Sequence, residues 1–401
     1  MKNEILKEAQ NLQEELVTYR RHLHENPEVG MELPNTATFV KEKLEEMGYE
    51  NVKMLAKTGV TAMAGGKQQG KVILLRADMD ALPILEETDE PFKSTNGCMH
   101  ACGHDFHTTM LLGAAKILKQ YEDKLEGTVK FMFQPGEEVL GGAKAMVAEG
   151  ILENPKVDAA VMFHIAAGMP IPAGTVIIPD EGPFSSASDW FTIDIKGKGG
   201  HGAMPEKAVD PLLVMANIHI ALQAIRSREI ASSANAVVTV GQMHGGTTSN
   251  VIPDTAMMEG TIRTYDKEDR ELILKRTGEI ASGIAIAYRA EAVTTIKEGC
   301  PSVVVDKKVS HDVREALTEM FGVMKVPPIE VVGMGKMSGS EDFSFVTEKV
   351  PGLMMMLSAG SIDEGYEYTM HHPKAHFNEE VLSQGAAAYA YLAYRWLQQN
   401  K

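Results

Sequence analysis

A short apolar run leads into two carboxylates at residues 72–83, which read VILLRADMDALP. Four consecutive aliphatic residues, Val72 to Leu75, are typical of a buried strand. Asp78 and Asp80 follow this strand, and carboxylates in that position can orient a bound ligand or a catalytic base. The segment therefore predicts a buried strand that ends beside a polar site.

On both sides of this segment, strand-like and helical patterns alternate. Apolar residues from Ile5 to Leu23 recur at spacings of four and three, which predicts an amphipathic helix, and a second helix is expected over 34–46, before Gly48. The order predicts an α/β fold whose sheet has helices on both faces. The remaining elements expected for it are strands at 60–64, 129–133, 159–163, 331–332 and 353–357, and helices at 105–118, 142–148 and 379–397.

The middle of the chain follows a different order. It predicts a strand at 190–196, a helix at 208–226, strands at 236–241 and 257–263, a helix at 268–289 and a strand at 291–296. The order β-α-β-β-α-β is the ferredoxin-like pattern. We therefore expect a discontinuous outer domain formed by residues 1–185 and 300–401, with residues 186–299 inserted as a second domain.

The composition narrows the range of partners. The 401 residues contain 39 Lys and Arg against 55 Asp and Glu, a formal net charge of −16. A surface of this sign repels phosphate backbones, so neither nucleic acid nor a membrane is an expected partner. We find no run of 18 apolar residues and no apolar signal-peptide core at the N-terminus. The three cysteines, Cys98, Cys102 and Cys300, do not indicate a disulfide framework, and we expect a cytoplasmic protein.

The most concentrated polar cluster reads MHACGHDFH at residues 99–107. It places a thiol, three imidazoles and a carboxylate within eight positions. Cys102 and His104 are two residues apart, so both can reach one cation, and Gly103 allows a close backbone approach. The alternative is a helix N-terminus capped by Asp105, with histidines that make only structural hydrogen bonds.

Other polar side chains stand at strand ends or near the C-terminus. Glu137 and Glu138 follow the strand at 129–133, His164 follows Phe163 at the end of the next strand, and residues 370–377 read MHHPKAHF. Each has a structural alternative, because adjacent glutamates usually lie in solvent and a single strand-end histidine is often structural. Taken together, the clusters predict a divalent-metal site assembled from both halves of the outer domain.

Eight motifs then resemble, in the same order, those of the M20 metallopeptidases. The resemblance is greatest to the amidohydrolase branch, which includes aminoacylases, hippurate hydrolases, auxin-conjugate hydrolases and N-acetyldiaminopimelate deacetylases. It spans nearly the whole chain and implies a mixed-sheet catalytic domain with an inserted lid and dimerisation domain. The motifs lie at residues 21–28, 76–83, 100–107, 134–138, 200–205, 249–254, 340–343 and 371–373.

The resemblance also implies a dinuclear site with two divalent ions per chain. Glu137 would be the general base, and Asp80 would orient the groups around the ions. Mixed sulfur, nitrogen and oxygen donors suit Zn, Mn, Co or Ni, and Cys102 would bind as a thiolate between the ions. His371 stands two residues before Pro373, as the family pattern requires, with His372 as the alternative. The implied ligands are Cys102, His104, Glu138, His164 and His371.

In the lid domain, the resemblance implies contacts with the substrate. His201 would hydrogen-bond the developing oxyanion, either in its own chain or in a neighbouring subunit, while Asn250 and Arg263 would bind the substrate. The planar guanidinium of Arg263 suits a carboxylate. The alternatives are a simple turn at 197–202 and a surface ion pair for Arg263. We expect a homodimer formed through the inserted domain, with a tetramer as the alternative.

These assignments imply a metal-dependent amidohydrolase that cleaves N-acyl amino acids into a carboxylic acid and a free amino acid. Glu137 would move a proton from water to the leaving nitrogen. A dipeptidase or carboxypeptidase of the same fold and a catalytically silent binding protein are the alternatives. A nucleophilic hydrolase built on Cys102 would resist chelators. The chain lacks the Pro-Cys-x-x-Cys element of zinc nucleobase deaminases.

Overall fold

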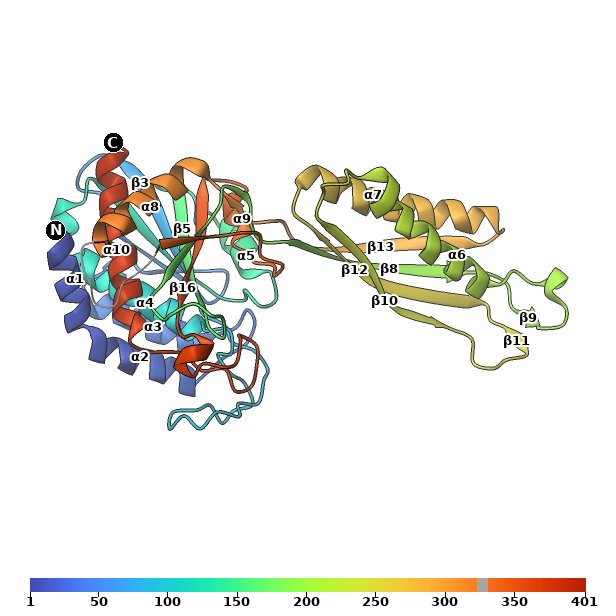
Figure 1. Ribbon diagram of the computed structural model, residues 1–401, viewed down its shortest axis with the longest axis horizontal. Coiled ribbons are helices and arrows are strands. Elements are labelled where there is room, and N and C mark those ends of the chain that lie inside the picture. Colours follow the sequence, from blue (N-terminus) through green and yellow to red (C-terminus); the bar gives the residue numbers. More distant parts are fainter. Residues whose placement is uncertain (323–330) are drawn as a thin grey trace. The chain divides into compact units, whose positions relative to one another are not determined.

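The computed structural model describes residues 1–322 and 331–401, which divide into two compact units (Figure 1). We call them the outer unit, formed by the described residues of Met1–Gly182, Val304–Gly335 and Asp342–Lys401, and the inserted unit, formed by Pro183–Val303 and Lys336–Glu341. The predicted division at 186–299 left residues 336–341 in the outer domain. Backbone hydrogen bonds from Met337 N to Phe184 O (2.8 Å) and from Ser186 N to Gly339 O (3.0 Å) hold this segment in the inserted unit.

The outer unit is built on one mixed eight-stranded sheet in the order β1-β2-β4-β3-β5-β16-β6-β15. Neighbouring strands are parallel from β4 to β16 and between β6 and β15, and the other pairs are antiparallel. The bounds are β1 (Lys53–Leu55), β2 (Gly59–Gly65), β3 (Lys71–Asp78), β4 (Gly127–Gln134), β5 (Ala159–Ala166), β6 (Val176–Pro179), β15 (Val331–Met334) and β16 (Gly352–Ser358). Two short strands, β7 (Gly182–Pro183) and β14 (Val304–Val305), lie where the chain passes between the units.

Helices cover both faces of this sheet, as predicted, which is why its central strands are continuous apolar runs. Side chains alternate along β4. The Phe131 ring contacts Tyr49, whose hydroxyl bonds the α4 backbone, whereas Lys130 and Gln134 point to the other face, where they bond Ile151 O and Asp342. One face carries α1 (Lys2–Asn11), α2 (Gln13–Glu25), α3 (Pro34–Glu46), α4 (His104–Gln120), α8 (Lys307–Phe321) and α10 (Val381–Gln399), and the other carries α5 (Gly142–Ala148) and α9 (Ser344–Thr347).

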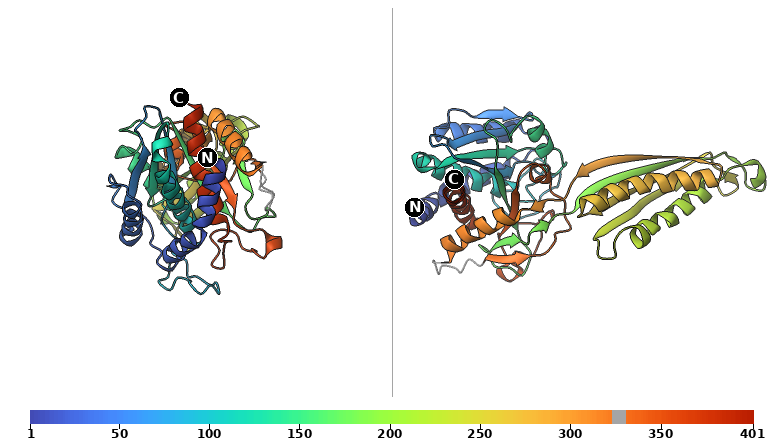
Figure 2. Two further views of the ribbon diagram at one scale, coloured as in Figure 1. Left: turned by 90° about the vertical axis from the view of Figure 1, so that its left-hand side faces the viewer. Right: turned by 90° about the horizontal axis from the view of Figure 1, so that it is seen from above.

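Both chain termini belong to the outer unit (Figure 2). Two 3₁₀ turns complete its elements, η1 (Glu122–Lys124) and η4 (Ile362–Glu364). Across the described residues, the helices all lack the combination of length and apolar character that a bilayer crossing requires.

The inserted unit follows the order β8-α6-β10-β12-α7-β13, the predicted ferredoxin-like pattern. Its antiparallel sheet has the strand order β10-β12-β8-β13, and α6 and α7 pack on one face over a core that includes Ile193, Ile218 and Ile273. Asp210 and Asp266 cap the two helices by accepting backbone N–H bonds. The bounds are β8 (Ala187–Lys196), β9 (Gly200–His201), η2 (Pro205–Lys207), α6 (Pro211–Ala224), η3 (Ile225–Glu229, a π-helical turn), β10 (Ala236–Gly245), β11 (Val251–Ile252), β12 (Thr255–Thr264), α7 (Lys267–Ala287) and β13 (Glu291–Cys300).

Two details differ from the predicted elements. The first predicted helix is interrupted by a turn at Leu12, but its apolar stripe from Ile5 to Leu23 is buried as expected. Helix α8 was not among the predicted elements, although its pattern is helical. Asp306 caps its first turn by accepting a bond from Val309 N, and Val309, Val313 and Leu317 are all buried on one side.

Candidate metal centre

The thiol and the first imidazole of the centre stand at the start of α4. Gly103 precedes the helix with φ near +90°, and a Cβ at this position would lie 2.3 Å from the Ile165 side chain. Only glycine fits here without displacing β5. Cys102 and His104 flank this glycine and are both buried. The helix start therefore places them beside the carboxyl end of β5, where His164 lies.

Asp80 fixes the two glutamates and His104 by hydrogen bonds. Its carboxylate accepts the backbone N–H of Glu137 at 2.9 Å and that of Glu138 at 3.1 Å. Its backbone carbonyl lies 2.8 Å from His104 Nδ1. Asp80, two residues beyond the end of β3, thus orients the loop after β4 and the first residue of α4.

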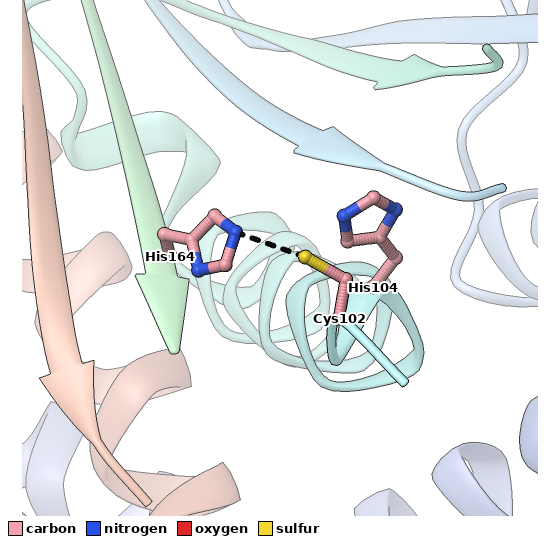
Figure 3. Close-up of side chains that lie close together, drawn as sticks. All are labelled: Cys102, His104 and His164. Atoms are coloured by element: carbon pink, nitrogen blue, oxygen red, sulfur yellow. Dashed lines mark hydrogen bonds between the residues drawn. The ribbon is translucent and has the colours of Figure 1, made fainter. Parts of the chain in front are cut away.

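The donor atoms of the predicted ligands lie close together. Cys102 Sγ is 3.4 Å from His164 Nε2, with His104 close by (Figure 3). Glu138 Oε1 is 3.5 Å from His371 Nε2 and 3.9 Å from His104 Nε2. Five groups among the described residues have all their donor atoms within 4.8 Å of one another, and three of them consist only of predicted ligands and Glu137: Cys102 with His104 and His164, Cys102 with Glu138 and His371, and His104 with Glu137 and Glu138. Because they share members, these groups form one contiguous cluster of sulfur, nitrogen and oxygen donors.

The hydrogen bonds of this cluster fit a bound cation. His104 and His164 direct Nδ1 to backbone carbonyls, at 2.8 Å from Asp80 O and 2.6 Å from Ile165 O, so Nε2 is the nitrogen that faces the cluster. Within the described part of the chain, His104 Nε2 and Glu138 Oε1 are buried without a hydrogen-bond partner. Burying such atoms costs free energy that a metal ion between them would offset.

The charges of the cluster point to the same interpretation. Burial raises the pKa of the Cys102 thiol and raises that of Glu138 to about 7, although His104 opposes both shifts. Burial alone would lower the pKa of His104, but Asp78 and Cys102 raise it well above its ordinary value. All three groups therefore favour protonation, and a divalent cation would reverse this by binding thiolate, carboxylate and neutral imidazole.

The structure separates His371 from His372. His371 has φ near +67°, its backbone N–H donates to Ala101 O at 2.9 Å, and its ring approaches Glu138. The ring of His372 stacks on Tyr368 at 4.3 Å, and its Nδ1 accepts the N–H of Lys374. His371 is therefore the histidine of this loop that joins the cluster.

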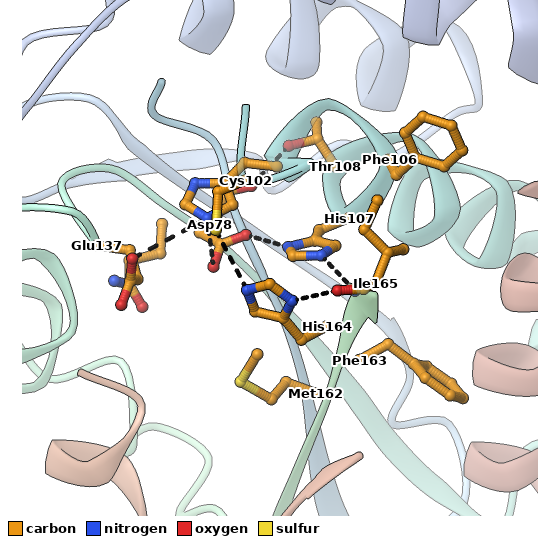
Figure 4. Close-up of polar contacts among 12 residues, drawn as sticks. Asp78, Cys102, Phe106, His107, Thr108, Glu137, Met162, Phe163, His164 and Ile165 are labelled. Carbon is orange, nitrogen blue, oxygen red and sulfur yellow. Dashed lines mark hydrogen bonds and ion pairs between the residues drawn. The ribbon is translucent and has the colours of Figure 1, made fainter. Parts of the chain in front are cut away.

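The neighbouring imidazole of His107 has a different environment (Figure 4). Its Nε2 accepts the Ile165 N–H at 2.8 Å and its Nδ1 donates to Asp78 at 2.5 Å. Burial lowers the pKa of His107 to about 3, against the opposing effect of Asp78. Both ring nitrogens of His107 are therefore occupied by hydrogen bonds. This fits the alternative in which a histidine of residues 99–107 makes structural hydrogen bonds and does not bind a metal ion.

The sequence indicated no specific role for His107, and it predicted for Asp78 only that its carboxylate can orient a ligand or a base. Asp78 is the last residue of β3, and it contacts Arg76 at 2.7 Å in addition to His107. The position of an aspartate at the end of a buried strand was the only signal for it. Nothing in the spacing of residues 99–107 separated His107 from the predicted ligands.

The predicted substrate-binding residues lie in the inserted unit. His201 belongs to β9 and is exposed, with Nδ1 accepting the Ala203 N–H, and Asn250 is also exposed. Arg263 lies on β12, donates to Thr261 and to Ile262 O, and places its guanidinium 5.5 Å from the centre of the Trp190 ring. Among the described residues Arg263 forms no salt bridge, and its role in substrate binding stays a prediction.

Comparisons with known proteins agree on one family. The family model described as Peptidase family M20/M25/M40 matches residues 74–395. The chain is 38% identical to an N-acetylcysteine deacetylase of Bacillus subtilis (94% of this chain and 96% of the relative) and 37% identical to an IAA-amino acid hydrolase of Arabidopsis thaliana (96% and 86%). The crystal structure of the YXEP protein of Bacillus subtilis, a dinuclear metal-binding peptidase of the M20 family, superposes with a TM-score of 0.82 at 35% identity (97% and 99% covered).

Proposed function

Because the chain belongs to peptidase family M20/M25/M40, we propose that it is a metal-dependent hydrolase that cleaves the amide bond of N-acyl amino acids, releasing a carboxylic acid and a free amino acid. The observation that carries this proposal is the donor cluster of the outer unit, in which the buried atoms His104 Nε2 and Glu138 Oε1 have no hydrogen-bond partner among the described residues. Relatives that share most of their length with this chain act, by their names, on acylated amino acids.

Two divalent ions would be held by Cys102, His104, Glu138, His164 and His371. When bound, they would polarise the scissile carbonyl and lower the pKa of a water molecule. The mixed donor set is compatible with Zn, Mn, Co or Ni. Five ligands exceed what a single tetrahedral ion requires, which supports two ions.

Glu137 is the proposed general base and acid. Its backbone N–H is anchored on Asp80, and its carboxylate lies 4.0 Å from His104 Nε2, at the edge of the donor cluster. From there it would accept the proton of the attacking water and deliver it to the leaving nitrogen. The amide requires this second transfer because an unprotonated amine is a poor leaving group.

The inserted unit would supply the remaining contacts. His201 would hydrogen-bond the oxyanion, Asn250 would bind the substrate, and Arg263 would pair with the carboxylate of the leaving amino acid. We also propose that this unit acts as a lid and forms a homodimer. Leu213 and Ile220, which are 50% and 69% exposed on α6, support an interface there.

We also propose a cytoplasmic location. It is supported by Cys98 and Cys102, which form no disulfide in the structure. Free thiols persist in reducing compartments, whereas secreted proteins tend to form disulfides.

The function is tested by turnover of a substrate panel with and without metal. The panel contains acetyl, benzoyl, indoleacetyl and long-chain acyl amino acids, together with dipeptides. We expect hydrolysis of one acyl class, loss of activity after chelation and recovery on adding a divalent ion. Preferential cleavage of dipeptides would instead establish a peptidase, and activity that resists chelation would contradict the metal mechanism.

Metal analysis tests the ligand set separately. The wild-type chain should hold close to two ions, and Cys102→Ser and His164→Ala should each lower that number. If both variants kept the full metal content and activity, these residues would not be ligands.

A further inference from the structure

The central sheet splits between β3 and β5 beside the metal centre. The two strands are paired in register from Ile73 with Ala159 to Arg76 with Met162, and the pairing ends there. Each strand continues beyond that point on its other side: β3 stays paired with β4 as far as Asp78, and β5 stays paired with β16 as far as Ala166. The separation is therefore confined to one strand pair.

Two buried side chains bridge this split. The Tyr389 hydroxyl, from α10, accepts the Phe163 N–H at 2.6 Å and donates to Arg76 O at 2.7 Å. One rung further along, the His107 ring accepts the Ile165 N–H and donates to the Asp78 carboxylate (Figure 4). Each side chain takes the place of a direct backbone bond, which would span only about 2.9 Å.

The two bridges flank His164. They hold the backbone N–H groups of Phe163 and Ile165, the residues directly before and after it. The Tyr389 ring also packs edge-on against Phe163 at 4.9 Å, and the His107 and His164 rings lie 4.6 Å apart. The backbone position of His164 is thus set from both sides by side chains that belong to α10 and α4.

We propose that Tyr389 and His107 are positioning residues that hold β3 and β5 apart and thereby place His164 for metal binding. This inference rests on the proposed function only in taking His164 as a metal ligand. The α4 turn with Cys102 stays attached to the β3 side through Asp80 and Asp78, whereas His164 belongs to the β5 side. The width of the split therefore determines the distance between His164 and Cys102.

Removing the Tyr389 hydroxyl would disturb this width. Arg76 O and the Phe163 N–H would lose the hydroxyl that now joins them, so the strands would move together to pair directly or admit a water molecule. Either change shifts the backbone at His164. Residues that orient metal ligands typically contribute 10-fold to 100-fold to metal affinity.

The test is a Zn²⁺ titration of metal-free full-length protein in competition with a chelator. In Tyr389→Phe, we expect one of the two equivalents to bind at least about tenfold more weakly, while the other keeps its affinity. Tyr391→Phe is the matched control, because it removes another buried hydroxyl from α10 that bonds Glu319, away from the metal centre. It should leave both affinities unchanged.

Thermal unfolding of the metal-free proteins separates positioning from a general structural role. If Tyr389→Phe lowered the melting temperature as Tyr391→Phe does, and both Zn²⁺ affinities were unchanged, Tyr389 would have only a structural role. That result would overturn the inference. If the wild-type chain itself bound no Zn²⁺, the proposed function would be overturned instead.

A second pair of variants tests His107 independently and applies even where Tyr389→Phe does not fold. His107→Gln keeps one donor and one acceptor, whereas His107→Leu keeps neither. Of the two Zn²⁺ ions, we expect the one that binds more weakly in Tyr389→Phe to be affected here as well. His107→Gln should bind this ion more tightly than His107→Leu does. Equal affinities in the two variants would contradict a positioning role for this bridge.

Discussion

Arg76 and Asp342, both fully buried, form an ion pair that joins β3 to the segment before α9. Asp342 also accepts bonds from the Gln134 side chain and the Ala143 N–H, so one carboxylate links β3, the end of β4 and the start of α5. Removing one partner of a buried pair leaves the other charge in the interior without full compensation. We expect Asp342→Ala to lower the free energy of unfolding of the outer unit by about 3 to 5 kcal/mol.

Chemical denaturation followed by Trp396 fluorescence measures this loss. Trp396 lies on α10 in the outer unit, and a Trp190→Phe background removes the signal of the inserted unit. Asp363→Ala, at an exposed carboxylate of the same unit, is the control and should change stability by no more than about 0.5 kcal/mol. A similar effect of both substitutions would show that the buried pair contributes little.

The two adjacent glutamates should separate into a base and a ligand. Glu137→Gln should keep both metal ions and the fold but lose a factor of about 10² to 10⁴ in kcat, because an amide cannot carry the proton. Glu138→Gln should weaken metal binding, since its Oε1 faces His104 and His371. Metal content and kcat measured on both variants check this division. Equal metal loss in the two variants would contradict the assignment of Glu137 as the base and Glu138 as the ligand.

Local pattern predicted much of the fold. Apolar runs predicted β3, β5 and β16, and a run interrupted only by Lys130 predicted β4, because strands covered on both faces have few polar side chains. The order β-α-β-β-α-β predicted the architecture of the inserted unit. Strand pairing beyond neighbours, such as β16 between β5 and β6, depends on contacts across nearly 200 residues, and local periodicity carries no information about it.

The candidate site was predicted unevenly for a physical reason. Strand ends and the Cys102–His104 spacing indicate where donors can gather, so Glu138 and His164 could be proposed from the chain. The hydrogen-bond partners of each imidazole could not be predicted from the sequence. His104 and His107 are distinguished only by the groups that their ring nitrogens contact in the folded chain. The Tyr389 hydroxyl bonds two strands that lie more than 200 residues earlier in the chain. The helical pattern around Tyr389 carries no information about these long-range hydrogen bonds.

Metal affinity should depend on pH through Glu138. Burial raises the pKa of Glu138 to about 7, whereas metal binding requires the ionised carboxylate. Below pH 7 each ion bound at this residue must displace one additional proton, so affinity should fall about tenfold more per pH unit below 7 than above it. Titration calorimetry in buffers of different ionisation enthalpy counts these protons. In Glu138→Gln the change of slope near pH 7 should disappear, and its persistence would assign the proton to another group.

Arg263 should select substrates that carry a free carboxylate. Its guanidinium makes no salt bridge among the described residues, so it is available for an anion. Arg263→Ala should lower kcat/KM for N-acyl amino acids by about 10- to 100-fold, the value of a charged hydrogen bond, and affect the matching amino acid amides much less. Comparable losses for acids and amides would show that Arg263 supports the inserted unit and does not bind the substrate.

His201 should act across a dimer if its exposed position on β9 serves a neighbouring active site. Glu137→Gln and His201→Ala, each inactive alone, are then co-expressed. A mixed dimer has one site with both defects and one site with neither, so random assortment should restore activity to about a quarter of all sites. If His201 serves its own chain, every site keeps one defect and no activity returns. Turnover per chain decides between the two, with native mass spectrometry to show that mixed dimers formed and with Glu137→Gln co-expressed with itself as the baseline.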